Sequence, residues 1–446
     1  MSRAPRFRRT AALALAALLA TCGVARAEDA TPADTTLHHF LGSLADSTDQ
    51  YFGLITAPVD TAGLDSALDA HLEKPWSGPR GRVYHSILPM YRFLRVDGSL
   101  WGGGLGFGDT RGLWRLRGDL GYADGSDTWL GGGELSLTKR KEEMVWRLTV
   151  AGGRRTEPIH RDYDEFEIAA LRALVSGNDN QSYLRRDGFM VAVTRVGVGW
   201  RAALKYRDWL ESPLTVRTTY NFSHDPLENP GNLAATLGRV RELGIDGQTR
   251  IPGTLFRAQL GYRLADGAIG SDFDYRRLRA SLAGDLPAGR HVSFVPQFAY
   301  GHLTGDPVPQ ASFYLGGPGT LRSIPTESLG GTGLAVARLD VIGHDDVLAL
   351  MHLPHPAMFP IQVGLFAATG ATWGNDPFGG PGTPRDRWPQ RNAWASEAGA
   401  SILYRPGIPD EDAYLKVNVA WPLGPVQHEA RWSVTYSRAL DLLKPF

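Results

Sequence analysis

The sequence predicts an all-β protein, a sixteen-stranded antiparallel transmembrane β-barrel with a short N-terminal helical segment. The first observation behind this prediction is a long series of segments in which apolar and polar side chains alternate with period two, as they do in barrel strands. The second is composition, because the 446 residues include 53 Gly, 12 Trp, 15 Tyr and 17 Phe. The third is that no run of about 18 apolar residues occurs, which excludes a helical membrane span and leaves a closed barrel as the membrane fold.

Charge and cysteine content exclude several classes of protein. Lys plus Arg and Asp plus Glu each number 47, so the chain lacks the basic excess of a nucleic-acid-binding protein. Cys22 is the only cysteine, which excludes a disulfide framework and a cysteine-based metal site. No phosphate-binding, zinc-protease or serine-hydrolase motif occurs. We therefore expect no metal, no cofactor and no nucleic-acid partner.

The N-terminal segments come first in chain order. The pattern of residues 1–27 predicts a secretory signal peptide. Four arginines precede a short apolar stretch, and Ala27 is the last residue of a small-x-small cleavage pattern. An alternative is lipidation at Cys22, which follows Leu-Ala-Thr in a poor lipoprotein box. Residues 28–80 predict a helical linker or plug, since leucine and phenylalanine recur there at helical spacing. Residues 81–446 are the predicted barrel.

Side-chain alternation within the predicted barrel is clear in residues 143–150, and segments 113–122, 255–264 and 415–421 repeat it. In the first of these, one face carries Met144, Trp146, Leu148 and Val150, and the other carries Glu143, Arg147 and Thr149. An aromatic face opposite a charged face is typical of lipid outside and water inside, although a soluble sandwich also alternates. We expect lipid contacts for Trp146, Trp200 and Trp421, and lumenal positions for Arg147, Arg201 and Lys416.

The alternation defines seventeen candidate strands, among them 187–196, 197–208 and 214–223. The first two of these share one parity, with Met190, Ala192 and Trp200 on the apolar side, so we interpret them as one long strand and count sixteen. An even number places both termini in the periplasm.

Connection lengths fit that orientation. The longest stretches, 155–186, 304–330 and 374–393, are then extracellular, as long loops of such barrels are. Residues 343–359 are long for a periplasmic turn.

Charged residues on the predicted lumenal face are mostly cationic. The cations are Arg115, Arg117, Arg147, Arg195, Arg201, Lys205, Arg207, Arg257 and Arg263, against the acidic Glu143 and Asp119. This surplus favours either a lumen that attracts anionic solutes or an interior filled with ion pairs and without an open channel.

A family resemblance rests on motifs in the last third of the chain. Residues 315–322 read Leu-Gly-Gly-Pro-Gly-Thr-Leu-Arg and precede a Gly-Gly-Thr-Gly run at 330–333 and the segment Ala-Val-Ala-Arg-Leu-Asp at 335–340. Residues 364–370 are similar to an F-x-D-x-G strand, and residues 420–423 read Ala-Trp-Pro-Leu. Together these resemble the bacterial surface antigen superfamily of BamA/TamA-like outer-membrane barrels, whose glycine-rich loop carries a V-R-G-F/Y motif.

The resemblance implies a sixteen-stranded barrel in which this loop folds into the lumen and its arginine binds strand residues there. By parity, Asp340 lies on the lumenal face and is the expected main partner of Arg322. The expected loop motif is Gly316, Gly317, Gly319 and Arg322, and the expected strand partners are Arg338, Asp340, Phe366 and Gly370.

The sequence also departs from the family pattern. Ser323 and Ile324 replace the glycine and the aromatic residue of the loop motif, and Ala368 stands where the family has Asp. Residues 28–80 leave no room for the family's periplasmic POTRA domains, so a barrel-only member is expected.

The resemblance implies a non-enzymatic protein of the bacterial outer membrane that acts in membrane biogenesis or in protein or lipid translocation. Its expected partners are outer-membrane lipid, a protein or lipid client, and the barrel assembly machinery through Phe446. The alternatives are a passive pore for small solutes and, less favoured, an outer-membrane enzyme with a dispersed Ser/His pair. His352 and His355 flank a Leu-Pro pair and are not expected to form a metal site.

Overall fold

The computed structural model describes most of the chain between Val83 and Ser437. The described residues are 83–109, 112–141, 144–159, 165–167, 181–218, 232–353, 360–377, 388–389, 393–404, 414–424 and 429–437. All of them belong to one compact unit, Tyr51–Phe446. The predicted signal peptide and helical segment, together with Cys22, His355 and Phe446, lie outside the described residues.

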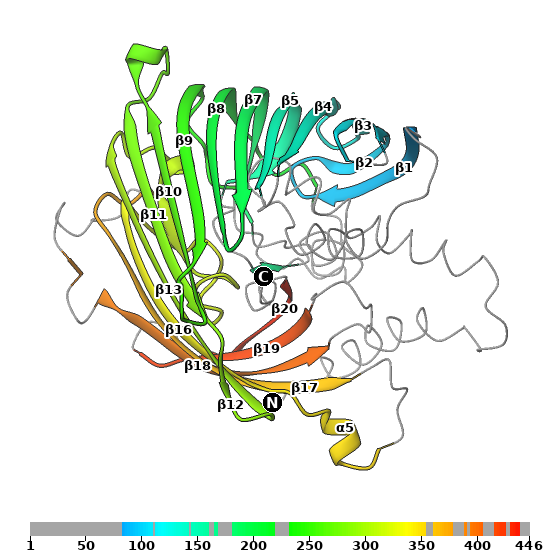
Figure 1. Cartoon of the computed structure of the whole chain (residues 1–446). Coiled ribbons are helices and arrows are strands. Elements are labelled where there is room, and N and C mark those ends of the chain that lie inside the picture. Colours follow the sequence, from blue (N-terminus) through cyan, green and yellow to red (C-terminus); the bar gives the residue numbers. More distant parts are fainter. Residues whose placement is uncertain are drawn as a thin grey trace. The chain divides into compact units, whose positions relative to one another are not determined.

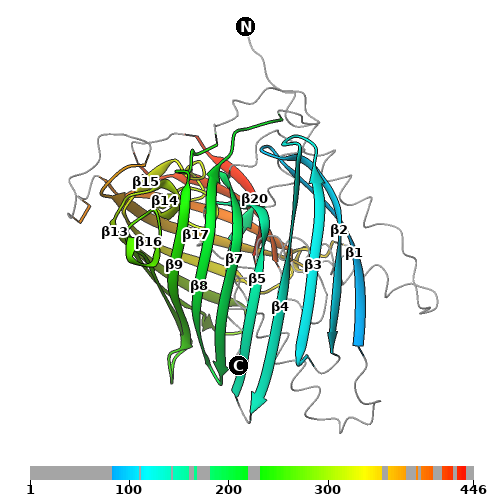
Figure 2. The same ribbon diagram turned by 90° about the horizontal axis from the view of Figure 1, so that it is seen from above.

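The fold is all-β and is dominated by one antiparallel sheet in which strands that follow one another in the chain lie side by side (Figures 1 and 2). Its long strands, in order of pairing, are β1 (Val83–Leu94), β2 (Gly98–Asp109), β3 (Trp114–Ala123), β4 (Thr128–Lys141), β5 (Met144–Pro158), β7 (Tyr183–Gly197), β8 (Trp200–Pro213), β9 (Gly238–Arg250), β10 (Phe256–Ala265), β11 (Tyr275–Gly284), β13 (Val292–Gly305), β16 (Gly333–Gly343), β17 (Ile361–Trp373), β18 (Ala395–Tyr404), β19 (Tyr414–Pro422) and β20 (Arg431–Ser437). Antiparallel neighbours need only short connections, which is why the chain can run up and down through the whole sheet.

Within the described part of the chain, four short strands complete the sheets. They are β6 (Glu165–Glu167), β12 (Leu286–Ala288), β14 (Phe313–Leu315) and β15 (Leu329–Gly331). β12 extends the pairing along β13, whereas β14 and β15 form a separate two-stranded sheet. The helical elements of the described residues are single turns: η1 (Gly267–Ile269), η2 (Pro309–Ala311) and α5 (Val347–Leu350). No helix within these residues is long and apolar enough to cross a membrane.

The connections differ in length at the two ends of the strands. At one end, only residues 142–143 separate β4 from β5, and only Val198 and Gly199 separate β7 from β8; we call this end the short-turn rim. The opposite end carries the long connections, among them 306–332 and 374–394. The long stretch predicted as a periplasmic turn begins at the short-turn rim and contains α5, whose first turn is capped by the Asp346 side chain.

The sheet is open in this structure, in contrast to the closed barrel that the sequence predicts. Within the described residues β1 pairs only with β2, and the far edge of β20 pairs with β6, where Thr435 lies opposite Glu167. Residues 435–437 at the end of β20 are therefore paired with a segment of the long connection between β5 and β7. A closed barrel of sixteen strands stays a prediction.

Two of the predicted strands differ from the structure. Residues 187–208 are not one strand but two, β7 and β8, joined at Val198–Gly199 and paired along their length. Gly199 has a φ angle of 73°, a left-handed conformation that suits glycine in a tight turn. The candidate at 214–223 is not a strand over residues 214–218, and its remainder lies outside the described residues.

The two faces of the sheet differ in chemistry. We call the face that carries Arg338 and Asp340 the inner face and the opposite one the outer face. Buried charged side chains line the inner face of many strands, whereas the outer face exposes large apolar ones. The exposed set includes Trp101, Leu120, Trp129, Trp146, Leu204, Ile245, Leu260, Leu365, Trp421 and Trp432.

A glycine-rich loop on the inner face

The glycine-rich loop lies between β14 and β15 and begins with a tight turn. Gly316 and Gly317, but not Gly319, have positive φ angles, of 119° and 92°. A side chain at Gly316 would place its Cβ 2.0 Å from the carbonyl oxygen of Pro325, so only glycine fits there. The Gly317 N–H donates to the carbonyl oxygens of Leu321 at 2.9 Å and Ile324 at 3.0 Å. The loop is therefore compact and held by its own backbone.

Arg322 projects from this loop onto the inner face. Its residue is 3% exposed. The Nη1 atom lies 3.5 Å from Asp340 Oδ1 on β16. The guanidinium carbon lies 4.2 Å from the centroid of the Phe366 ring on β17, within the range of a cation–π contact. Arg322 thus meets a carboxylate and an aromatic face on two adjacent strands.

Arg338 joins the same group from within β16. Its Nε lies 2.9 Å from Asp340 Oδ2. Its Nη1 donates to the Pro318 carbonyl of the loop at 3.1 Å. Asp340 therefore receives two guanidinium groups, and Arg338 ties the strand carboxylate to the loop backbone.

Two glycines let the loop and the strands approach closely. A Cβ on Gly370 would lie 2.8 Å from the Leu315 side chain at the start of the loop. A Cβ on Gly399 would lie 2.3 Å from the Phe366 ring. The absence of a side chain at Gly370 therefore lets the loop pack against β17. The absence of one at Gly399 leaves space for the Phe366 ring, which Arg322 contacts.

Sequence reasoning missed Glu397 on β18. This carboxylate is 1% exposed, and its Oε2 accepts the Ser323 backbone N–H at 2.6 Å. Glu397 is the cross-strand partner of Ala368, the position at which the sequence lacks the family's acidic residue. The available signal was a glutamate on the inner parity of the strand predicted at 394–404, one strand away from the gap.

The other predicted lumenal cations occupy a mixed-charge surface. Many have a carboxylate partner: Arg207–Glu242 at 2.7 Å, Lys205–Asp246 at 2.7 Å, Arg263–Glu242 at 3.9 Å and Arg115–Glu134 at 3.9 Å. These pairs favour the ion-pair interpretation of this face. Glu143 lies outside the described residues.

The parity assigned to β7 from the sequence is wrong. Arg195 is the cross-strand partner of Trp146, so it lies on the outer face. Met190 and Ala192, predicted to contact lipid, are buried on the inner face. The cause is the turn at Val198–Gly199, because treating 187–208 as one strand carried the correct parity of β8 backward onto β7.

Histidines do not gather into a metal site in the part of the chain that the structure describes. His291 Nδ1 lies 2.8 Å from Asp345 Oδ1, and His344 Nε2 lies 2.8 Å from the Ser293 hydroxyl. No group of three or more His, Cys, Asp or Glu side chains among the described residues is placed to hold a metal ion.

Comparisons with known proteins gave matches only among solved structures. No family model matches the chain, and no curated protein matches it. The chain is similar to CdiB from Acinetobacter baumannii, with 12% identity, a TM-score of 0.42 and coverage of 80% of this chain and 59% of that one. It is also similar to BamA from Haemophilus ducreyi lacking POTRA domains 1-3, with 10% identity, a TM-score of 0.47 and coverage of 88% and 80%. A third match is the outer membrane protein opdK from Pseudomonas aeruginosa, with 11% identity, a TM-score of 0.37 and coverage of 80% and 96%. The chain spans less than two thirds of the length of the CdiB chain.

Proposed function

We propose that the chain is an outer-membrane β-barrel protein of the surface antigen type, acting in membrane biogenesis or in translocation of a protein or lipid client. The observation that carries the proposal is the docked glycine-rich loop, in which Arg322 meets Asp340 and Phe366 while Ser323 meets Glu397. The loop joins β16, β17 and β18 from the inner side.

The outer face supports the membrane placement. Met144, Trp146, Leu148 and Val150 are each between 37% and 42% exposed on β5. The intervening Arg147 points to the inner face and is partly buried. Apolar residues that alternate outward with inward charges fit lipid on one side of a strand and a polar interior on the other.

A conductance experiment tests the state of the lumen. The full mature chain is inserted into a planar bilayer beside a variant in which Arg322 and Glu397 are both replaced by alanine. With the loop docked, we expect the native protein to be nearly silent and the variant to show frequent large steps. The matched control replaces Glu211 with alanine. Glu211 is a buried inner-face glutamate of β8 that pairs with Arg186 rather than with the loop, so this variant loses an inner-face ion pair but should stay as silent as the native protein. Large steady steps from the native protein would contradict the proposal and support a passive pore.

A client experiment tests the biogenesis role directly. The gene is deleted in the native bacterium, and outer-membrane and secreted proteins are quantified by mass spectrometry. We expect specific outer-membrane or secreted proteins to fall and to recover with the native gene but not with the loop variant. An unchanged proteome combined with slower uptake of small anions would instead support the pore, which the surplus of inner-face cations favours.

A further inference from the structure

We propose that the outer face near the short-turn rim binds the phosphate of an anionic phospholipid, with Arg195 as the main contact. The inference rests on the proposed membrane placement, since it requires lipid against the outer face. It goes further by naming the residues, the leaflet and the chemical group that they recognise.

Arg195 lies between two tryptophans. Its guanidinium carbon is 4.9 Å from the Trp146 ring centroid and 5.3 Å from that of Trp200. The ring faces attract the cation electrostatically and do not replace conventional hydrogen-bond acceptors for its N–H groups. A phosphate accepts from two guanidinium N–H groups at once.

The polar contact that Arg195 makes in this structure is weak. Its Nη2 lies 2.7 Å from the Met144 sulfur, which is a poor hydrogen-bond acceptor. Its Nε is buried without a hydrogen-bond partner among the described residues. No described carboxylate forms an ion pair with Arg195, although the side chain lies on an apolar surface where a lone cation is costly.

Another pair of outer-face arginines shows the contrast. Arg239 Nε lies 2.6 Å from Asp208 Oδ1, and Arg241 Nε lies 3.1 Å from Asp208 Oδ2. Those cations carry their own counter-ion at the opposite end of the strands. Arg195 is paired with aromatic rings instead.

Two lysines extend the cationic surface along the same rim. Lys139 is the cross-strand partner of Trp146 on β4, and Lys141 is that of Met144. Both lysines are exposed. Lys139, Trp146 and Arg195 therefore form a row across β4, β5 and β7, with the aromatic ring in the middle.

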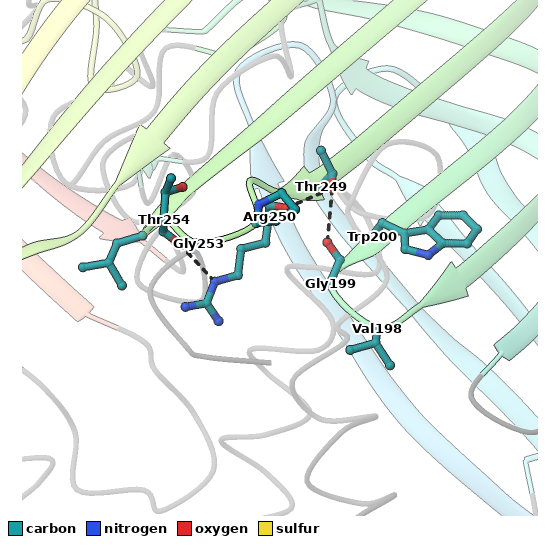
Figure 3. A pocket seen from close by; sticks show the side chains of 9 residues that line it. Val198, Gly199, Trp200, Thr249, Arg250, Gly253 and Thr254 are labelled. Atoms are coloured by element: carbon teal, nitrogen blue, oxygen red, sulfur yellow. Dashed lines mark hydrogen bonds between the residues drawn. The ribbon is translucent and has the colours of Figure 1, made fainter.

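A hollow of about 500 Å³ lies next to Trp200, the second tryptophan that Arg195 contacts. Figure 3 shows Trp200 at one side of it and Arg250 and Thr254 at the other, between the turn at Val198–Gly199 and the one that precedes β10. Trp200 thus borders both the hollow and Arg195. Arg195 does not line the hollow, which therefore offers space for the rest of a lipid headgroup only on the other side of Trp200.

The position selects a phospholipid of the periplasmic leaflet. Short turns of such barrels face the periplasm, and tryptophans gather at the depth of the headgroups. Basic residues near a membrane surface favour anionic lipids. A cation stacked on tryptophan at this depth therefore fits a phosphodiester better than a soluble solute.

Native mass spectrometry tests the inference. The mature full chain is purified in detergent and mixed with equal amounts of phosphatidylglycerol and phosphatidylcholine. We expect the protein to retain phosphatidylglycerol in preference, and Arg195→Gln to reduce that preference about fivefold. The matched control is Arg201→Gln, which removes an inner-face arginine at the same rim and should leave the preference unchanged.

Three outcomes overturn the inference. One is an equal preference in the native protein and in Arg195→Gln. Another is that Arg201→Gln reduces the preference for phosphatidylglycerol as much as Arg195→Gln does. The third is removal of bound lipid by millimolar inorganic phosphate, which would point to a site for the free anion.

Insertion into lipid vesicles is measured in parallel for both variants. A native chain that does not insert contradicts the proposed membrane placement. A chain that inserts but whose lipid preference ignores Arg195 contradicts only this inference.

Discussion

Arg322 contacts a carboxylate on one strand and an aromatic ring on the next, and its replacement should destabilise the protein. We expect Arg322→Ala to lower the free energy of unfolding by about 2–4 kcal/mol. This is near the lower end for breaking a buried pair, because Arg338 still neutralises Asp340. The measurement is denaturant unfolding in lipid vesicles, followed by tryptophan fluorescence.

A double-mutant cycle with Asp340→Asn isolates the ion pair. Coupling of about 1–2 kcal/mol is expected for partners in one buried group. A parallel cycle combines Arg322→Ala with Glu211→Ala. These two residues are not in contact, so we expect no coupling energy between them. If the cycle with Asp340→Asn also gives no coupling energy, Arg322 is held by Phe366 and the loop backbone rather than by the carboxylate.

Glu397 should hold the loop through the Ser323 N–H. Glu397→Ala leaves that buried donor without its acceptor, a loss of about 1–3 kcal/mol. It should also expose the bond after Arg322 to trypsin, which is read out as a new fragment on a gel. Adding Ala368→Asp should restore part of the protection, because position 368 lies directly opposite 397. A double variant cleaved as fast as Glu397→Ala would show that the carboxylate cannot act from the neighbouring strand.

At the residue scale, sequence reasoning reaches as far as the parity of a single strand. Parity placed Asp340 and Arg338 on one face, and both lie there beside Arg322. It could not find Glu397, because its closeness to the loop depends on the register between β17 and β18 and on the fold of the loop. Neither is encoded in the alternation of one strand.

The hairpin of β7 and β8 is the element whose faces the structure reassigns. Val193 is 40% exposed on the outer face, and Met190 is 3% exposed on the inner face. If the outer face contacts lipid, Val193→Arg should cost about 1–2 kcal/mol. Val193 lies two residues from Arg195 on the same face, between the membrane midplane, where such a change costs about 2–4 kcal/mol, and the interface, where it costs about 0–1 kcal/mol. Val193→Leu adds volume without charge and serves as the control. Unfolding in vesicles gives both values, and an equal cost for the two would argue against lipid at Val193.

The sequence misleads at this hairpin for a physical reason. β7 carries small or apolar residues on both faces, since Met190 and Ala192 lie inward while Val191 and Val193 lie outward. Alternation in β7 is therefore weak, whereas β8 alternates strongly between Leu204 and Lys205. The two-residue turn adds no polar break, so the two strands resemble one.

At the scale of the whole molecule, hydrogen bonding between successive hairpins should make the folded chain resistant to detergent. We expect the mature protein to change its migration on a gel after boiling, because the folded form is compact and binds less dodecyl sulfate. The measurement is a semi-native gel of the membrane fraction, with the Val193→Arg variant as a destabilised comparison. A soluble periplasmic pool with unchanged migration would contradict an outer-membrane barrel.

The strand order of the whole sheet follows from period-two alternation and short turns, and so could be predicted in outline. The open edge could not be predicted, because β6 has only three residues, Glu-Phe-Glu, within a long connection, too few for alternation to mark a strand. Its pairing with β20 depends on which unpaired edge is within reach, a property of the folded molecule.

The pairing of β6 with β20 also bears on the order in which the molecule folds. Each long strand pairs with the next long strand in the chain, so most of the sheet forms through local contacts that close quickly. Other contacts are not local. Among them, the loop reaches Glu397 across 74 residues, and the last strand meets a segment from the first half of the chain. Each of these contacts forms only after a long stretch of chain has been closed into a loop, which costs conformational entropy. The β6 segment therefore stays without its partner strand until the C-terminal hairpin forms, and that hairpin completes the sheet by pairing with residues from much earlier in the chain.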